Sequence, residues 1–257
     1  MSYNYMNPTR FNFLKVQISA ESLSTATSKV LGYSFKKPDY ICFPDASVVK
    51  AANDDPLLLD ILNHSYLTLP DGKPSQLAAK LQGFKNVSTV SGFYLMKNLL
   101  NSGLTHYFYG GDEQVLKKMK VYLENDFPNA RVLGYKSPPF VPVNEIKSNR
   151  QIADDIEQIK KLKPDIVWIG ISSRKQDYLM HYHFKSFDHS LLVGVGGVFL
   201  YISDDSLKSP EWVKKIGMRW AYRLSKEPKR LWPKYYETIL FLLKNSGFFI
   251  KSALHRA

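Results

Sequence analysis

The sequence has little cysteine: Cys42 is the only one among 257 residues. A single thiol excludes an intramolecular disulfide framework, and it excludes zinc and iron–sulfur sites built from several cysteines. Six histidines are present, but none has the spacing of metal ligands, because His181 and His183 would lie on different faces of a helix. We therefore expect no metal cofactor, and the low cysteine content fits a reducing compartment.

Long apolar segments are also absent. The longest runs are short, such as residues 239–243, whereas a membrane-spanning helix needs about 18 or more predominantly apolar residues. The N-terminal residues 1–7 lack a basic region followed by an apolar one, which is the pattern of a secretory signal. We therefore expect neither a spanning helix nor a signal peptide.

Acidic residues are scarce towards the C-terminus. The whole chain has 35 Lys and Arg against 23 Asp and Glu, a net charge of +12. Residues 207–257 hold twelve of the basic and three of the acidic residues, a net charge of +9. This asymmetry predicts a body at 1–206 and a basic appendage at 207–257 that seeks an anionic partner, either a membrane surface, a nucleic acid or a phosphorylated ligand. The alternative is a solvated basic pair of helices.

Apolar residues in this tail recur at helical spacing, namely Trp212, Ile216, Trp220, Leu224 and Leu231. Basic residues lie between them, and aromatic residues continue to Phe249. A basic amphipathic helix with aromatic residues suits a bilayer interface, where each basic residue near an anionic leaflet contributes about 1 kcal/mol. The apolar stripe could instead pack on the body. Nucleic acid is the weakest alternative, because no known binding module accompanies the charge.

The body alternates short apolar runs with helical segments. Strands are expected at 40–43, 66–69, 106–109, 131–134, 165–171 and 191–195, and helices at 47–63, 74–81, 93–100, 112–125, 149–161 and 174–183. Such alternation is typical of parallel βαβ units. The predicted fold class is therefore α/β, with a compact, largely parallel sheet flanked by helices and a helical C-terminal appendage.

Ligands of open α/β sheets bind beyond the carboxyl ends of the strands. This rule selects five loops, which are Pro44-Asp45, Pro70-Asp71-Gly72, Gly110-Gly111-Asp112, Ile171-Ser172-Ser173 and Gly196-Gly197. The two Gly-Gly pairs follow strands, and glycine lets a backbone approach a phosphate closely. Neither is a Walker A or GxGxxG sequence, so each is also explained as a tight turn between strand and helix.

Two side chains in these loops could take part in chemistry. Asp71 lies between Pro70 and Gly72, which is first a turn sequence, but a carboxylate at this edge is also placed to act as a general base. Gln176 can both donate and accept hydrogen bonds, which suits a nucleobase edge or a sugar hydroxyl. Its alternative is an exposed residue at the start of a helix.

Seven ordered motifs resemble the WecG/TagA/CpsF family, glycosyltransferase family 26, from about Tyr40 to Tyr236. They are Pro44-Asp45-Ala46, Leu69-Pro70-Asp71-Gly72, Tyr109-Gly110-Gly111, Gly134-Tyr135 with Ser137-Pro138-Pro139-Phe140, the segment 170–177, the segment 194–199, and the closing run 217–232. The closing run is the most specific of these.

The resemblance implies an inverting glycosyltransferase. Such enzymes move a sugar from a UDP-sugar to a polyprenyl-diphosphate-linked saccharide, with no cofactor or bound metal, in the synthesis of bacterial surface polysaccharides. It also implies a peripheral location at the cytoplasmic face of the inner membrane, an appendage that docks on an anionic membrane and completes the active site, and no nucleic-acid partner. Whether the chain forms a homo-oligomer stays open.

Individual roles follow from the same resemblance. Asp71 matches the proposed general base, which would deprotonate the acceptor hydroxyl. Donor-pocket positions are matched by Gly110, Gly111, Gln176, Gly196 and Gly197. Arg223 and Arg230 match appendage arginines that could neutralise the diphosphate as UDP leaves, since guanidinium groups pair with phosphate in a bidentate manner.

The sequence also departs from the family pattern. The residues that differ are Asp45 in place of Asn, and also Thr89, Leu200, Lys208, Arg219 and Pro233. Asp45 is then a second candidate base or a ligand of a sugar hydroxyl in the donor pocket. These departures favour a hexose-type, glucose-like donor and an exopolysaccharide acceptor over N-acetylmannosamine chemistry. They also motivate the alternative of a non-catalytic nucleotide-sugar-binding scaffold with the same fold.

Overall fold

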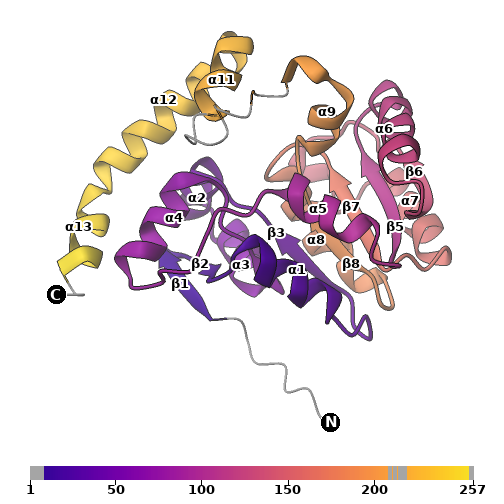
Figure 1. The fold of residues 1–257 in the computed structure, drawn as a ribbon, viewed down its shortest axis with the longest axis horizontal. Coiled ribbons are helices and arrows are strands. Elements are labelled where there is room, and N and C mark those ends of the chain that lie inside the picture. The colour runs from indigo at the N-terminus through magenta and orange to yellow at the C-terminus, as the bar shows by residue number, and fades with distance from the viewer. Residues whose placement is uncertain (1–8, 208–209, 211–212, 214–218, 255–257) are drawn as a thin grey trace.

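A six-stranded parallel sheet forms the centre of the molecule (Figure 1). The computed structural model describes residues 9–207, 210, 213 and 219–254. The strand order is β4-β3-β8-β7-β5-β6, and every neighbouring pair is parallel. The strands are β3 (Asp39–Cys42), β4 (Leu67–Thr68), β5 (Thr105–Gly110), β6 (Arg131–Lys136), β7 (Ile166–Gly170) and β8 (Leu191–Gly194). The predicted α/β class with a parallel sheet is confirmed.

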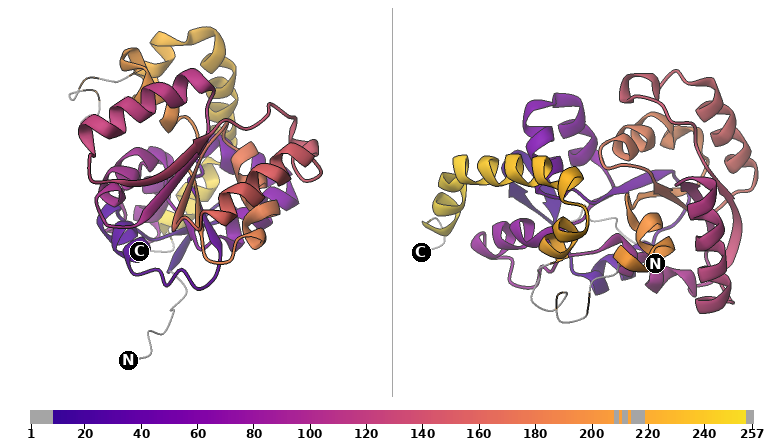
Figure 2. Two further views of the ribbon diagram at one scale, coloured as in Figure 1. Left: turned by 90° about the vertical axis from the view of Figure 1, so that its right-hand side faces the viewer. Right: turned by 90° about the horizontal axis from the view of Figure 1, so that it is seen from above.

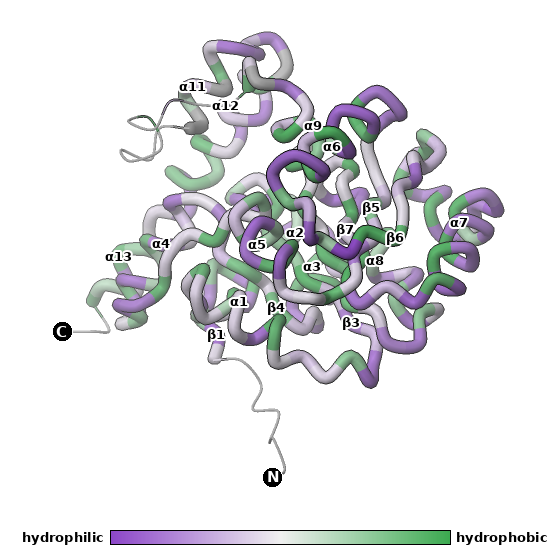
Figure 3. The backbone as a smooth tube through the Cα atoms, turned by 45° about the vertical axis from the view of Figure 1, so that its right-hand side comes forward, coloured by the Kyte–Doolittle hydropathy of each residue, from purple (hydrophilic) through white to green (hydrophobic). Residues whose placement is uncertain are grey.

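Helices cover both faces of this sheet (Figure 2). Successive side chains of a strand point to opposite faces. In β7, Val167 and Ile169 accordingly enter one buried core, and Ile166 and Trp168 enter the other. The first core is completed by α2 (Ala46–Asp54), α3 (Pro56–His64), α7 (Arg150–Lys161) and α8 (Lys175–His183), and the second by α1 (Leu23–Leu31), α5 (Gly92–Leu100), α6 (Glu113–Asp126) and α9 (Val198–Ser203). Figure 3 shows hydrophobic residues concentrated along these central strands.

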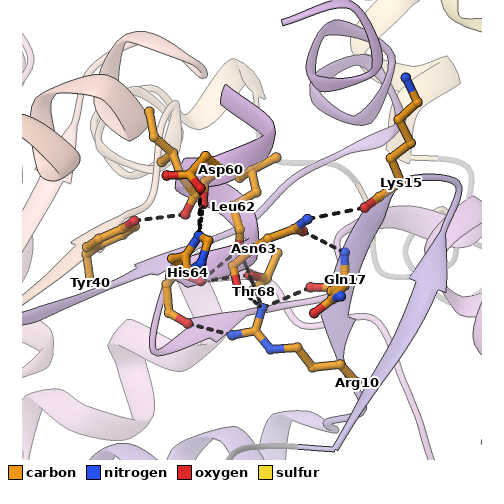
Figure 4. A network of polar contacts seen from close by, with 11 residues as sticks. Arg10, Lys15, Gln17, Tyr40, Asp60, Leu62, Asn63, His64 and Thr68 are labelled. Carbon is orange, nitrogen blue, oxygen red and sulfur yellow. Dashed lines mark hydrogen bonds and ion pairs between the residues drawn. The ribbon is translucent and has the colours of Figure 1, made fainter. Parts of the chain in front are cut away.

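An antiparallel hairpin precedes the sheet, formed by β1 (Arg10–Phe13) and β2 (Val16–Ser19). Arg10 joins it to the body, because its guanidinium donates to the carbonyl oxygen of Asn63 at 3.2 Å and to Thr68 Oγ1 at 3.2 Å (Figure 4). The Asn63 side chain in turn accepts from the backbone of Gln17 at 2.8 Å. The hairpin also packs against α4 (Gly72–Leu81).

The single helix expected at 47–63 was wrong, because the segment forms α2 and α3. Asp55 is extended and caps α3 by accepting from the backbone of Leu57 at 3.1 Å and of Leu58 at 3.0 Å. Pro56 occupies the first turn of α3, where its missing N–H costs nothing. Proline also disfavours a helical conformation in the preceding residue, which ends α2.

The C-terminal residues form α11 (Arg219–Lys226), α12 (Pro228–Lys244) and α13 (Ser246–Leu254). Helix α12 packs on α2, and α13 packs on α4 (Figure 1). No described helix is long and apolar enough to cross a membrane. The division at 206/207 stays a prediction. Several tail residues singled out above lie outside the described part of the chain, namely Lys208, Trp212, Ile216, Gly217 and Met218.

Candidate active site

All six strands end at the same edge of the sheet, here called the carboxyl edge. Cys42 of β3 lies opposite Thr68 of β4 in the parallel register. Asp45 and Asp71 each follow these paired residues by three positions, so the register carries both carboxylates just beyond the same edge. Each begins a helix, since Asp45 is the N-cap of α2 and Asp71 is the N-cap position of α4.

Asp71 is half-buried in a loop that its neighbours fix. The backbone N–H of Leu69 donates to the Cys42 carbonyl at 2.8 Å, and the N–H of Val90 donates to the Pro70 carbonyl at 2.8 Å. The Asp71 side chain makes no capping hydrogen bond to α4. Gly72 has a φ of +81°, a conformation that glycine adopts without strain. The expected turn is therefore present, and it presents a carboxylate at the carboxyl edge.

Asp45 uses both of its oxygen atoms. Oδ1 accepts from the backbone of Ser47 at 2.9 Å and of Val48 at 3.0 Å. Oδ2 accepts from Nζ of Lys234, on α12, at 2.8 Å. Burial alone would raise the pKa of Asp45, but the Lys234 charge and these hydrogen bonds together hold that pKa below its ordinary value. Asp45 is therefore a carboxylate that caps α2 and binds the C-terminal helix.

The Gly110-Gly111 turn leaves no room for a side chain beside the neighbouring strand. Gly110 has a φ of +149°, and a Cβ atom there would lie 2.4–2.6 Å from backbone atoms of Gly170. The N–H of Gly111 donates to the carbonyl of Gly170 at 3.0 Å, and α6 then begins with Asp112 as its cap. Only glycine fits at 110. The tight-turn interpretation is therefore sufficient, and the turn also opens the N-terminus of a 14-residue helix towards the carboxyl edge.

Gln176 is buried beneath the turn that follows β8. Its Nε2 donates to the carbonyl of Gly194 at 2.9 Å, and its Oε1 accepts from the N–H of Gly196 at 2.6 Å. The exposed helix-start interpretation of Gln176 was wrong. The side chain holds the turn that contains Gly196, whose φ is +57°, and Gly197, at which a Cβ would meet nothing within 4 Å.

Comparisons with known proteins identify the family of this chain. The sequence model of the family "Glycosyl transferase WecG/TagA/CpsF family" matches residues 11–255. This chain belongs to the WecG/TagA/CpsF glycosyltransferase family. It is 26% identical to the N-acetylglucosaminyldiphosphoundecaprenol N-acetyl-beta-D-mannosaminyltransferase of Bacillus subtilis (strain 168), over 77% of this chain and 78% of the relative. It is 27% identical to the protein of the same name from Bacillus spizizenii, over 74% of each chain.

In this WecG/TagA/CpsF family member, the loop after β6 contributes residues that had no assigned role in the sequence. Ser137 Oγ donates to the carbonyl of Gly111 at 2.7 Å, which joins this loop to the Gly-Gly turn. Phe140 is 96% exposed, and Nζ of Lys175 lies 4.2 Å from its ring centroid. Lys175 also donates to the carbonyl of Val141 at 2.8 Å. The aromatic ring of this loop and a cation from the first residue of α8 therefore lie together, and the loop itself is bonded to the Gly-Gly turn.

Two further residues without an assigned role lie at the start of α8. Arg174 has a φ of +67°, which is strained for a non-glycine residue, and it lies in the loop after β7. Asp177 is 2% exposed, with Cys42 as a hydrogen-bonding neighbour. Burial raises the pKa of Asp177 to about 7. One of its oxygens, Oδ1, has no hydrogen-bond partner among the described residues, which fits a carboxyl group that is protonated near neutral pH.

The structure describes only the backbone of the two predicted arginines. The backbones of Arg223 and Arg230 lie in α11 and α12, but their side chains are outside the described part of the structure. Within the residues described, no three His, Cys, Asp or Glu side chains cluster as a metal site would require, and metal-independence stays a prediction. A separate surface hollow lies between α6 and β6, lined by Leu123, Phe127, Val132 and Tyr135, and includes none of the predicted site residues.

Proposed function

We propose that this chain is an inverting glycosyltransferase that moves a hexose-type sugar from a UDP-sugar to a saccharide linked to a polyprenyl diphosphate. Membership of a glycosyltransferase family supports the reaction class. The relatives' name, which specifies an N-acetylglucosaminyldiphosphoundecaprenol acceptor, supports the lipid-linked acceptor. The observation that carries the proposal is Asp71, a half-buried carboxylate at the carboxyl edge, in the loop after the strand next to that of Asp45 and on the same edge as the two glycine turns.

Asp71 is the general base of the proposed reaction. It takes the proton from the acceptor hydroxyl while that oxygen forms a bond to the anomeric carbon. The bond from the anomeric carbon to the diphosphate oxygen breaks, and UDP leaves with the electron pair. Attack opposite to the leaving group inverts the anomeric centre. Asp45 is less suited to this role, because hydrogen bonds and the Lys234 ammonium stabilise its charged form and lower its basicity.

The donor nucleotide is proposed to lie over the loops of Gly110-Gly111 and Gly196-Gly197. The N-terminus of α6 favours an anionic group there, and Gln176 keeps the second turn in shape. Arg223 and Arg230 are proposed to offset the charge that develops on the leaving diphosphate. Hydrogen-bond donors and arginines of this kind stabilise the leaving group in place of a metal ion.

A peripheral location at the cytoplasmic face of the bacterial inner membrane is part of the proposal. The supporting observations are the +9 charge of residues 207–257 and a set of exposed apolar side chains on α12. These side chains are Trp232, Tyr236, Ile239 and Leu243, which recur at steps of four, three and four residues. Such a stripe on a basic helix suits insertion at the boundary between head groups and acyl chains.

The proposal also specifies the donor sugar and the product. The departures from the family pattern, including Asp45, favour a glucose-like donor and an exopolysaccharide product, whereas both relatives are named for N-acetylmannosamine transfer. A panel of UDP-sugars that includes UDP-N-acetylmannosamine separates these alternatives. Selective binding of that sugar would replace the donor assignment and leave the reaction class intact.

The deciding experiment measures binding and slow hydrolysis of each UDP-sugar by the wild type and by Asp71→Asn, with and without anionic liposomes. We expect saturable binding of one UDP-sugar by both proteins and at least a hundredfold slower hydrolysis by Asp71→Asn. The matched control is Asp154→Asn, at an exposed position on α7 away from the carboxyl edge loops. Unchanged hydrolysis in Asp71→Asn would refute the assignment of the base.

A non-catalytic nucleotide-sugar-binding scaffold is the second candidate. The observation in its favour is that the polar side-chain atoms of Asp45 and Gln176 form hydrogen bonds within the protein. UDP-sugar binding without hydrolysis, or without transfer to lipid extracts that contain polyprenyl-diphosphate saccharides, would favour this candidate. Measurable turnover that depends on Asp71 would exclude it.

A further inference from the structure

Helix α12 is held on α2 by two ion pairs of opposite polarity. Nζ of Lys234 lies 2.8 Å from Oδ2 of Asp45, and Nζ of Lys50 lies 2.5 Å from Oε2 of Glu237. In the first pair α12 supplies the cation, and in the second it supplies the anion. The first pair is about one-third exposed on each side, so it is partly shielded from water.

This arrangement specifies one register. If α12 slid by one turn so that Glu237 faced Asp45, two carboxylates would meet. If it slid by one turn the other way, Lys234 would face Lys50, and two ammonium groups would meet. Repulsion between like charges disfavours each of these two shifted registers. The charge pattern therefore selects the observed register.

The same contacts set the rotation of α12 about its own axis. Leu231 and Thr238 are buried, and Phe241 and Leu242 pack against the core beneath α12. At 100° per residue, Lys234 lies on this inner side of the helix, whereas the stripe of Trp232, Tyr236, Ile239 and Leu243 lies on the outer side. Helix α12 therefore presents one cation to the carboxyl edge while its apolar stripe faces away from the body.

We propose that Lys234 is a positioning residue: its ion pair with Asp45, together with the reversed pair of Lys50 and Glu237, holds α12 in register and so fixes the appendage against the candidate active site. The inference rests on the proposed function for its catalytic consequence only. It also explains why aspartate replaces the family's asparagine at position 45, because asparagine could cap α2 but would not form an ion pair with Lys234.

The register is tested by charge exchange across the second pair, which lies outside the proposed catalytic machinery. Lys50→Glu and Glu237→Lys each set like charges together, and we expect hydrogen exchange of the backbone amides at 228–244 to rise at least fivefold in each. The double variant restores opposite charges, and its exchange should return to within twofold of the wild type. Failure of the double variant to restore protection would overturn the register.

The positioning role is tested with Lys234→Met, which keeps an unbranched side chain of nearly the same length and removes its charge. We expect the UDP Kd to stay within twofold of the wild type, while kcat for hydrolysis of the best-bound UDP-sugar falls at least fivefold. Asp45→Asn should give the same loss, and the double variant no further loss. The matched control is Lys244→Met, at the exposed end of the same helix.

The two arms separate failure of this inference from failure of the proposed function. Wild-type kcat together with unchanged exchange in Lys234→Met would overturn the positioning role, although UDP-sugar turnover by the wild type would still stand. Absence of UDP binding by the wild type would refute the proposed function, whereas the exchange measurements would still test the register of α12.

Discussion

Oε1 of Gln176 accepts a hydrogen bond from the backbone N–H of Gly196 at 2.6 Å, and the Nε2 of the same amide donates to the carbonyl of Gly194 at 2.9 Å. One side chain of α8 therefore pairs with a backbone carbonyl and a backbone N–H on either side of the turn that follows β8. A buried side chain with both partners on a glycine turn is well suited to fix the shape of a ligand loop.

Gln176→Leu should lower the free energy of unfolding by about 3 kcal/mol, because a buried carbonyl and a buried N–H each lose their partner. Urea unfolding monitored by circular dichroism measures the change. The control is Gln158→Leu, at an exposed position on α7, for which we expect a change below about 0.5 kcal/mol. Equal stability of the two variants would show that the amide does not support the turn.

Gly110→Ala should be more disruptive than any other single glycine substitution at the Gly-Gly turns. Its Cβ would lie 2.4–2.6 Å from the backbone of Gly170, which no side-chain rotation can relieve, and φ at this position is +149°. We expect a loss of about 3 kcal/mol or more, or failure to fold. Gly247→Ala, at which a Cβ meets nothing within 4 Å, should keep the wild-type melting temperature. A stable Gly110→Ala protein would contradict the predicted clash of its Cβ with the backbone of Gly170.

Much of this fold could be predicted from the sequence. The strands that lie at the centre of the sheet are short apolar runs between turn residues, and their length and flanking turn residues favour a strand over a buried helix. The position of the candidate site at the carboxyl edge could be predicted from the parallel arrangement of the strands alone. Asp45, Asp71 and the two glycine pairs all lie on loops that leave this edge, as expected.

Other features depend on contacts that sequence patterns do not contain. The β1–β2 hairpin alternates polar and apolar residues, but its turn at Leu14 and Lys15 has no glycine, asparagine or proline, although Leu14 adopts a φ of +56°. The ion pair of Lys234 with Asp45 joins residues 189 positions apart. Only the packing of α12 on α2 brings these two together, so neither composition nor local spacing could have indicated it.

Asp177 should make stability depend on pH. The folded chain keeps this carboxyl protonated up to a pKa of about 7, whereas the unfolded chain releases the proton near pH 4. Between these values the folded state binds more protons, so its stability falls as pH rises. Asp177→Asn removes this effect. Its stability relative to the wild type should therefore increase by about 1 kcal/mol per pH unit from pH 5 to pH 7 and level off above pH 7.

Urea unfolding of both proteins at pH 5, 6, 7 and 8 tests this dependence. Asp154→Asn, at an exposed position on α7, controls for the chemical change from carboxylate to amide. A stability difference between Asp177→Asn and the wild type that is the same at every pH would mean that Asp177 does not titrate in this range.

Phe140 should contribute to nucleotide affinity if the donor binds over the Gly110-Gly111 turn. Its ring is 96% exposed with Lys175 on one face, on a loop that Ser137 joins to the turn. Stacking of a base on an aromatic ring contributes about 1–3 kcal/mol, so Phe140→Ala should weaken UDP binding about tenfold. Titration calorimetry with UDP and with inorganic pyrophosphate distinguishes a base contact from a phosphate contact.

The Phe140 test has two matched comparisons. Phe140→Tyr keeps the ring and should keep UDP affinity. Leu162→Ala alters an exposed apolar residue at the C-cap of α7 and should have no effect. Pyrophosphate affinity should be the same in all these proteins. If Phe140→Ala binds UDP as the wild type does, the nucleobase lies elsewhere along the carboxyl edge.

The outer stripe of α12 should determine binding to anionic vesicles. Ile239 and Leu243 are 49% and 65% exposed on a helix whose opposite side packs against α2 and the core. Glutamate at both positions removes apolar insertion and adds repulsion from anionic lipid, so the double variant Ile239→Glu and Leu243→Glu should sediment at least tenfold less with such vesicles.

The control for this test is Val121→Glu on α6, another exposed apolar position, which should sediment as the wild type does. UDP affinity should be unchanged in both, because neither substitution lies at the carboxyl edge. Equal sedimentation of the double variant and the wild type would mean that the basic side chains bind the vesicle without this stripe.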